Sequence, residues 1–168
     1  GVDAAFVPGR ITAVLGQNGS GKTTLVRHLI GLVRPTSGTI RYMGDTISDR
    51  STAELARSIA YVFQHPDQMI FEDKVLDELT FSARTMGKPW TVEQAEELLQ
   101  AYGIQELKDA FPNTLPMGIK HMLTILSVLL TDPDVIILDE PTLGMDSEMK
   151  TKLTALMKRL AGEGKIGR

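Results

Sequence analysis

The chain has 168 residues, a length that allows one domain with a sizeable hydrophobic core. Hydrophobic residues make up 42% and charged residues 23%, as in ordinary globular proteins, and the net charge of −3 argues against a nucleic-acid partner. There is no cysteine, which excludes a disulfide framework and a thiolate metal site. The longest apolar run, residues 122–130, is less than half of the roughly 20 residues that a membrane-spanning helix needs, so it predicts a buried helix.

A glycine-rich segment near the N-terminus, GQNGSGKTT at residues 16–24, matches the phosphate-binding pattern G-x-x-x-x-G-K-[ST] at every fixed position. We predict a buried strand over residues 11–15 before it and a helix over residues 25–30 after it. Glycines let consecutive N–H groups point into one concavity, and the helix N-terminus adds positive potential there. The segment therefore predicts a nucleotide site formed by Gly16, Asn18, Gly19, Ser20, Gly21, Lys22, Thr23 and Thr24, with Lys22 at the outer phosphates and the Thr23 hydroxyl on Mg²⁺.

The next part of the chain alternates between strand and helix signals. Residues 39–43 alternate in polarity, which predicts a half-exposed strand, and residues 59–63 predict a buried strand that ends at Gln64. Between them, Ser51 and Glu54 form a capping-box pattern that predicts a short helix.

The middle of the chain has helical periodicity and little strand signal. Thr91 and Gln94 form a second capping-box pattern, which predicts the start of one of these helices. We therefore predict a single α/β domain over residues 1–168, with a core of residues 1–74 and 129–168 and an inserted helical subdomain at about 75–128.

The core resumes with the apolar run 135–138, which is typical of a central parallel strand. Asp139 and Glu140 follow at its carboxyl end, the edge where open α/β sheets bind ligands. Taken alone, such a pair is better interpreted as two solvated acids. Beside a phosphate loop it predicts Asp139 holding Mg²⁺ through water and Glu140 polarising the attacking water. A last amphipathic helix is predicted over residues 147–161, with Leu153, Leu156 and Leu160 on one face.

In order and spacing, these segments resemble the ATP-binding cassette (ABC) ATPases, the nucleotide-binding subunits of ABC transporters. Residues 16–24 are similar to the Walker A loop, residues 135–140 to Walker B with its catalytic glutamate, and residues 143–146 to the D-loop. Gln64 matches the Q-loop glutamine, which in the family contacts Mg²⁺ and senses the transmembrane subunit. The resemblance runs from about residue 6 to residue 160.

The resemblance implies a P-loop NTPase (RecA-like) fold with a parallel-sheet core, ATP and Mg²⁺ as cofactors, and ATPase activity. It implies that Lys22, Gln64 and Glu140 are catalytic, and that the metal ligands are Thr23, Gln64 and Asp139.

The run QHPDQMIF at residues 64–71 is similar to the form in ATPases of cobalt-type and energy-coupling-factor importers, which take up metal ions or vitamins. This one short segment favours uptake over export, and the sequence leaves the direction of transport open. We interpret His65 as a loop residue, because no second histidine or acidic cluster lies at ligand spacing.

One family motif is degenerate. Where ABC ATPases carry L-S-G-G-Q, at the start of a helix that meets the partner subunit's ATP, this chain has Leu115-Pro116-Met117-Gly118-Ile119. Pro116 has no hydroxyl and no N–H, and Met117 places a side chain where close backbone approach is needed. We predict that the helix forms with Pro116 in its first turn and that the signature function is lost. Lys120 and His121 are interpreted as a solvated helix face.

The resemblance further implies a head-to-tail homo- or heterodimer with a second ABC ATPase subunit, and transmembrane partner subunits that hold the chain at the cytoplasmic side of the inner or plasma membrane. Glu140 favours a motor subunit that couples ATP hydrolysis to transport. The degenerate signature favours the alternative, a nucleotide-binding half with a structural or regulatory role in a heterodimer. A third possibility, a soluble ABC protein acting on DNA or ribosomes, is disfavoured by the acidic balance.

Both ends of the sequence look cut. Residue 1 is a glycine, residues 2–7 resemble the tail of a strand, and residues 162–166 resemble a turn leading into another strand. We expect a fragment without the family's adenine-stacking aromatic residue and switch histidine, and we expect it to be a poor ATPase in isolation.

Overall fold

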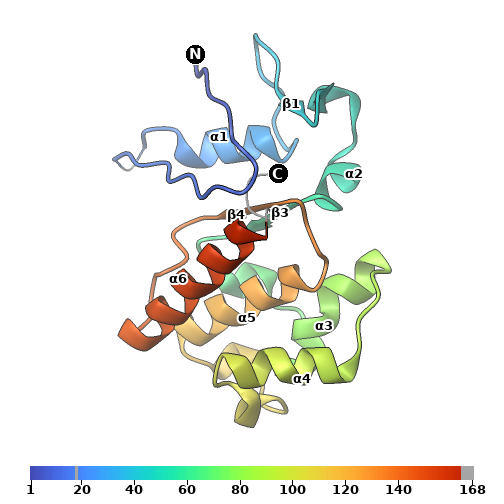
Figure 1. The fold of residues 1–168 in the computed structure, drawn as a ribbon, viewed down its shortest axis with the longest axis vertical. Helices are drawn as coiled ribbons and strands as arrows, with labels where there is room; N and C mark the ends of the chain where they lie inside the picture. The colour runs from blue at the N-terminus through green and yellow to red at the C-terminus, as the bar shows by residue number, and fades with distance from the viewer. Residues whose placement is uncertain (18, 164–168) are drawn as a thin grey trace. The chain divides into compact units, whose positions relative to one another are not determined.

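A computed structural model describes residues 1–17 and 19–163 (Figure 1). The chain divides into two compact units. Unit 1 comprises residues 1–61, 133–137 and the chain from residue 157 onward, and unit 2 comprises residues 62–132 and 138–156. Each unit is described by itself. The division into a core and a helical subdomain near residues 75 and 128 stays a prediction.

Unit 1 contains a short hairpin and two helices on a small apolar core. Strands β1 (Arg41–Tyr42) and β2 (Asp45–Thr46) pair in antiparallel register, followed by the 3-10 turn η1 (Ile47–Asp49). Helix α1 spans Lys22–Leu29, and helix α2 spans Thr52–Ala56 with the predicted capping box at Ser51. The strand expected at residues 39–43 is thus present in shorter form. The core consists of Ile47, Leu55 and Ile59, with Ile30, Ile40, Tyr42, Val135 and Ile137 packed against them.

The buried strand predicted over residues 11–15 is wrong. Residues 10–17 have no strand assignment in the structure, and Leu15 is 90% exposed. A strand exists through its ladder of hydrogen bonds to a neighbour, and no described residue provides one here: the sheets pair only β1 with β2 and β3 with β4. The strand tail expected at residues 2–7 is absent for the same reason. Apolar, β-branched composition alone did not determine a strand.

The strands predicted at residues 59–63 and 135–138 are present as a pair, but in the described part of the chain the second has one neighbouring strand and is not central. Strand β3 (Ile59–Val62) and strand β4 (Val135–Leu138) form one sheet. Val135 N donates to Ser58 O at 3.0 Å, and Asp139 N donates to Val62 O at 3.1 Å. Residue numbers increase in the same direction along both strands from the first bond to the second, so the two strands are parallel. Ile59, Ala60 and Val62 are buried, whereas β4 is half-buried along its length.

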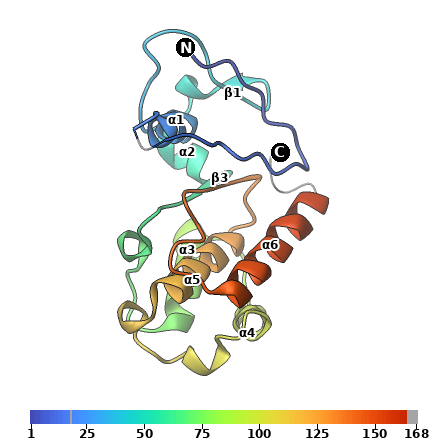
Figure 2. The same cartoon turned by 90° about the vertical axis from the view of Figure 1, so that its left-hand side faces the viewer.

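Unit 2 is helical around α3 (Val75–Met86), α4 (Val92–Ala101) and α5 (Met117–Leu129), and both ribbon views show α3 beside α5 (Figures 1 and 2). Helix α3 packs on α5 and contacts α4, with the 3-10 turn η2 (Pro66–Met69) also against α5. The capping box at Thr91 is confirmed: Thr91 Oγ1 accepts from Gln94 N at 3.2 Å, and Gln94 Oε1 accepts from Thr91 N at 2.9 Å. The remaining 3-10 turns are η3 (Gln105–Leu107) and η4 (Pro112–Thr114).

Helix α5 is buried without interruption from residue 121 to residue 128, which confirms the buried helix expected from its apolar run. Helix α6 (Ser147–Gly162) is also confirmed, with Leu153, Leu156 and Leu160 buried as predicted. Within residues 1–17 and 19–163, no helix combines the length and apolarity needed to cross a bilayer. The turn and further strand expected around residues 162–166 lie largely outside the described residues.

Candidate functional site

The phosphate loop of unit 1 ends where α1 begins, at Lys22. Gly19 and Gly21 have φ values of 80° and 92°, in the left-handed region that glycine adopts without strain. The first helical hydrogen bond runs from Leu25 N to Gly21 O at 2.8 Å. In the described chain no side chain caps this helix, and its first turn holds no acidic residue. The N–H groups of that turn are therefore arranged as an anion site requires.

The Lys22 ammonium lies over the loop. Its Nζ donates to Gly16 O at 2.7 Å and to Gln17 O at 3.1 Å. The loop is tight, since a β-carbon at Gly16 would lie 2.5 Å from Ser20 Oγ. Thr23 and Thr24 are exposed at the start of α1, while Asn18 lies outside the described residues. The structure thus gathers the described members of the predicted nucleotide site in unit 1.

Two further predicted residues meet in unit 2. Gln64 Nε2 donates to Glu140 Oε2 at 2.9 Å, although the residues are 76 positions apart. Asp139 N donates to Val62 O at 3.1 Å, so the acidic pair begins where the parallel ladder ends. The structure brings Gln64 and Glu140 together. Whether they share a pocket with Lys22, which belongs to the other unit, stays a prediction.

Glu140 has a φ of 47°, a left-handed conformation that is uncommon for a residue with a β-carbon. The carbonyl of Glu140 accepts from Leu143 N at 3.1 Å, which closes a turn directly after β4. This turn reverses the chain into the predicted D-loop and fixes the backbone from which the Glu140 carboxylate projects.

The interpretation of Lys120 and His121 as a solvated face is wrong. The His121 side chain is fully buried, with Nε2 2.9 Å from Gln64 O and Nδ1 3.0 Å from Leu143 O. Lys120 pairs with Asp67 at 2.6 Å, and its side chain is only 12% exposed. The sequence did contain a signal for the histidine: residue 121 lies three positions after Gly118 and four before Ile125, on the buried stripe of the helix.

The degenerate signature begins α5 as predicted, with Pro116 as its N-cap residue, directly before the first turn. The Pro116 carbonyl accepts from Ile119 N and Lys120 N, both at 3.0 Å. Gly118 is buried against Gly144 in the predicted D-loop, and a β-carbon on Gly144 would lie 2.8 Å from Met117 Cβ. The signature segment and the D-loop are therefore packed together inside unit 2.

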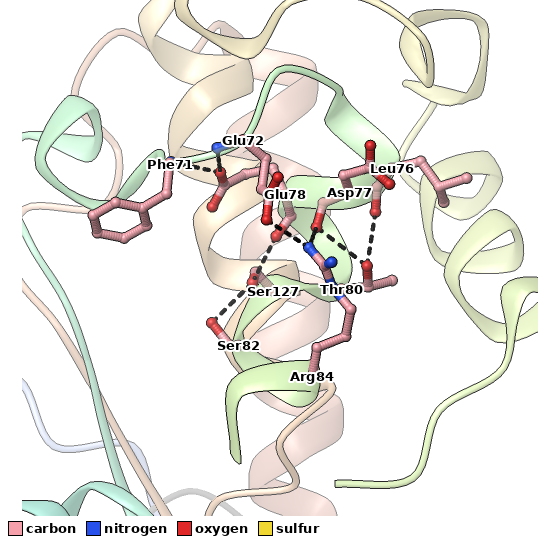
Figure 3. Close-up of polar contacts among 9 residues, drawn as sticks. All are labelled: Phe71, Glu72, Leu76, Asp77, Glu78, Thr80, Ser82, Arg84 and Ser127. Carbon is pink, nitrogen blue, oxygen red and sulfur yellow. Dashed lines mark hydrogen bonds and ion pairs between the residues drawn. The ribbon is translucent and has the colours of Figure 1, made fainter. Parts of the chain in front are cut away.

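One buried acid, Glu78, orders the end of the Gln64–Phe71 run (Figure 3). Glu78 Oε2 accepts from Phe71 N at 2.7 Å and from Glu72 N at 2.8 Å. Ser127 Oγ of α5 donates to Glu78 O at 3.1 Å, which ties α3 to α5. Burial raises the pKa of the Glu78 carboxyl, and the two backbone N–H groups oppose that rise. Sequence reasoning missed this residue because a glutamate in a helix is usually exposed.

The predicted metal ligands are oxygen donors: the Thr23 hydroxyl, the Gln64 amide and the Asp139 carboxylate. Within the described residues, no three histidine, cysteine, aspartate or glutamate side chains form a group able to hold a metal ion. A hydroxyl, an amide and one carboxylate suit Mg²⁺, which takes its other ligands from phosphates and water. The donor set therefore fits this ion by its chemistry.

Several known proteins are similar to this chain in sequence. The family model described as ABC transporter matches residues 1–143. The energy-coupling factor transporter ATP-binding protein EcfA of Methanoculleus marisnigri is 36% identical over 153 residues, covering 90% of this chain and 55% of that protein. A relative from Methanosarcina acetivorans is 38% identical, and the chain spans only 31% of its length.

Two solved structures are also similar. CbiO1 of Clostridium perfringens, part of the ABC transporter complex CbiONQ, has a TM-score of 0.82 and 32% identity, covering 99% of this chain and 68% of that chain. The ATP-binding cassette MJ0796, a dimer in a post-hydrolysis state bound to ADP and Pi, has a TM-score of 0.86 and 25% identity, covering 98% and 75%. These likenesses confirm the predicted P-loop NTPase type of α/β fold. The chain belongs to the ABC transporter family, among its ATP-binding subunits.

Proposed function

We propose that this chain is the nucleotide-binding part of an ABC transporter subunit that binds and hydrolyses MgATP and passes the resulting motion to membrane partners. The observation that carries the proposal is the 2.9 Å hydrogen bond between Gln64 and Glu140. A carboxylate held at the carboxyl end of a strand by the glutamine of the transporter-sensing loop is placed to link hydrolysis with the partner.

The residues divide the chemistry between them. The loop N–H groups and Lys22 bind the phosphate oxygens and offset their negative charge. Glu140 accepts a proton from the attacking water. The Glu140 side chain is exposed, so a water molecule from the solvent can reach its carboxylate. Thr23, Gln64 and Asp139 would hold Mg²⁺, which when bound supplies positive charge to the phosphates.

We base a proposal for the class of transported substrate on residues 64–71, which are similar to the corresponding segment of importer ATPases. The EcfA relative and the CbiO1 neighbour carry names of importer-type components, which supports uptake of a metal ion or a vitamin. The dimeric MJ0796 neighbour supports a second ABC ATPase subunit as partner. We propose that transmembrane subunits hold this assembly at the cytoplasmic side of the membrane.

The degenerate signature supports a second candidate, a nucleotide-binding half with a mainly structural or regulatory role. Pro116 occupies the N-cap of α5 and offers neither a hydroxyl nor an N–H, so the site that this segment completes on a partner would be weak. In this case the chain binds ATP but turns it over slowly.

The test is Glu140→Gln in the intact protein assembled with its partners. Because general-base catalysis contributes roughly 10²- to 10⁴-fold, ATP turnover falls by that order while ATP binding is kept. Glu148→Gln, on an exposed acid of α6, is the matched control and leaves turnover unchanged. A Glu140→Gln variant with normal turnover refutes the hydrolytic role. A wild-type protein that binds ATP without turnover supports the structural candidate.

A further inference from the structure

Four residues of unit 2 form a closed ring of contacts. His121 Nε2 contacts Gln64 O at 2.9 Å, and Gln64 Nε2 donates to Glu140 Oε2 at 2.9 Å. Leu143 N donates to Glu140 O at 3.1 Å, and Leu143 O lies 3.0 Å from His121 Nδ1. The ring joins three segments that are distant in sequence: the Gln64 loop, the turn after β4 and the first turns of α5.

We propose that His121 is a positioning residue that fixes Gln64 and Glu140 relative to each other. It holds the backbone of both loops from one side, while the Gln64–Glu140 hydrogen bond joins their side chains. This inference rests on the proposed function, because it assigns His121 an effect on the turnover that Glu140 supports.

The geometry favours this role over that of an ordinary core histidine. Both ring nitrogens face carbonyl oxygens, and carbonyls only accept hydrogen bonds, so the ring donates from its protonated nitrogen to the carbonyl opposite. The two carbonyls come from positions 57 residues before and 22 residues after the histidine. A histidine that served only to fill space would have no need to bridge two loops that carry predicted site residues.

The neighbouring contacts hold the histidine itself in place. Thr124 Oγ1 donates to His121 O at 2.9 Å within α5. One residue before His121, the Lys120–Asp67 ion pair attaches the helix to η2, which follows Gln64 in the chain. Because His121 contacts the carbonyls of Gln64 and Leu143, a displacement of the first turns of α5 would disturb both loops.

The experiment uses the intact protein in its transport complex and compares three variants. His121→Leu keeps roughly the same volume and removes both ring nitrogens, whereas His121→Gln restores an amide N–H donor for one of the two carbonyls. Thr131→Val is the matched control, a buried change directly after the same helix, where the threonine hydroxyl donates to Val128 O at 2.7 Å, a carbonyl that is not part of the ring. Thermal unfolding establishes that all three variants are folded.

Expected kinetics separate positioning from folding. His121→Leu lowers kcat by about 10- to 100-fold with the KM for ATP within about twofold, because a misplaced catalytic group slows the chemical step. His121→Gln recovers part of kcat, and Thr131→Val changes it by less than about twofold. Adding His121→Leu to Glu140→Gln costs nothing further. A folded His121→Leu with normal kcat, or a further loss in the Glu140→Gln background, overturns the inference.

A readout independent of activity separates this inference from the proposed function. In His121→Leu, amide hydrogen exchange in segments 64–71 and 140–146 becomes about fivefold faster, as expected for one lost hydrogen bond, and Thr131→Val leaves it unchanged. If the wild-type protein does not hydrolyse ATP, the proposed function fails while exchange still tests the positioning. If amide hydrogen exchange in these segments is unchanged in His121→Leu, the positioning role is refuted, whatever the rate of ATP turnover.

Discussion

Gly118 and Gly144 approach so closely that a β-carbon on Gly118 would lie 2.6 Å from the Gly144 carbonyl oxygen and 2.9 Å from Met145 Cα. These are backbone atoms, which cannot move aside to make room for a β-carbon as the end of a flexible side chain can. Gly118 is one of the two residues of the degenerate signature that agree with the family pattern. The packing of Gly118 against the predicted D-loop explains why a glycine is needed at this position, independently of any contact with a partner's nucleotide.

Gly118→Ala is therefore expected to destabilise the protein by about 1–3 kcal/mol, the usual cost of overpacking a tight contact. Chemical denaturation measures the change. Gly162→Ala is the control, because Gly162 is also a helical glycine but no described residue lies within 4 Å of its β-carbon position. This substitution should be neutral or stabilising by up to about 1 kcal/mol. Equal effects of the two substitutions would contradict the steric explanation.

Lys22→Ala should weaken ATP binding by roughly 10- to 100-fold, since a hydrogen bond to a charged group contributes about 1.5–3 kcal/mol. Isothermal titration with ATP and magnesium checks this. Lys158→Ala, on an exposed position of α6, removes the same charge elsewhere and should bind ATP normally. If both variants bind as the wild type does, Lys22 does not contact the phosphates.

Glu78→Gln should change how stability depends on pH. Because burial raises the folded-state pKa of Glu78 above its ordinary value of 4.5, the native protein holds this proton more tightly than the unfolded chain. The contribution of Glu78 to stability is therefore full below its ordinary pKa and is lost as pH rises through the raised value. Denaturation from about pH 4 to about pH 7 should show the wild type losing stability relative to Glu78→Gln. A difference that is constant with pH, or of opposite slope, would refute the argument.

Thr91→Ala should destabilise the protein by about 1 kcal/mol, because it removes the acceptor for Gln94 N at the start of α4. Thermal unfolding of the wild type and the variant measures the loss. Thr154→Ala provides the comparison: the hydroxyl of this exposed threonine of α6 donates to Lys150 O, the carbonyl one turn before it, so its loss should cost little. A Thr91→Ala variant as stable as Thr154→Ala would mean that the cap is not formed in solution.

Local signals in the sequence predicted much of the fold. The glycine pattern before Lys22, the capping boxes at Ser51 and Thr91, and the apolar run before Asp139 each depend on residues a few positions apart. Backbone preference, capping and periodicity act over that range, so the corresponding loop, helices and strand are found in the structure. The segment at residues 11–15 shows the limit, since its strand required a partner that composition does not supply.

The sequence by itself therefore determined the elements and the chemical types at their ends: a lysine after glycines, and two acids after an apolar strand. Tertiary structure alone decided that Gln64 bonds Glu140, that His121 is buried between two loops, and that Gly118 touches Gly144. The physical reason is that hydrogen bonding and close packing between distant segments depend on where the whole chain places each backbone. No periodicity within a short window encodes that placement.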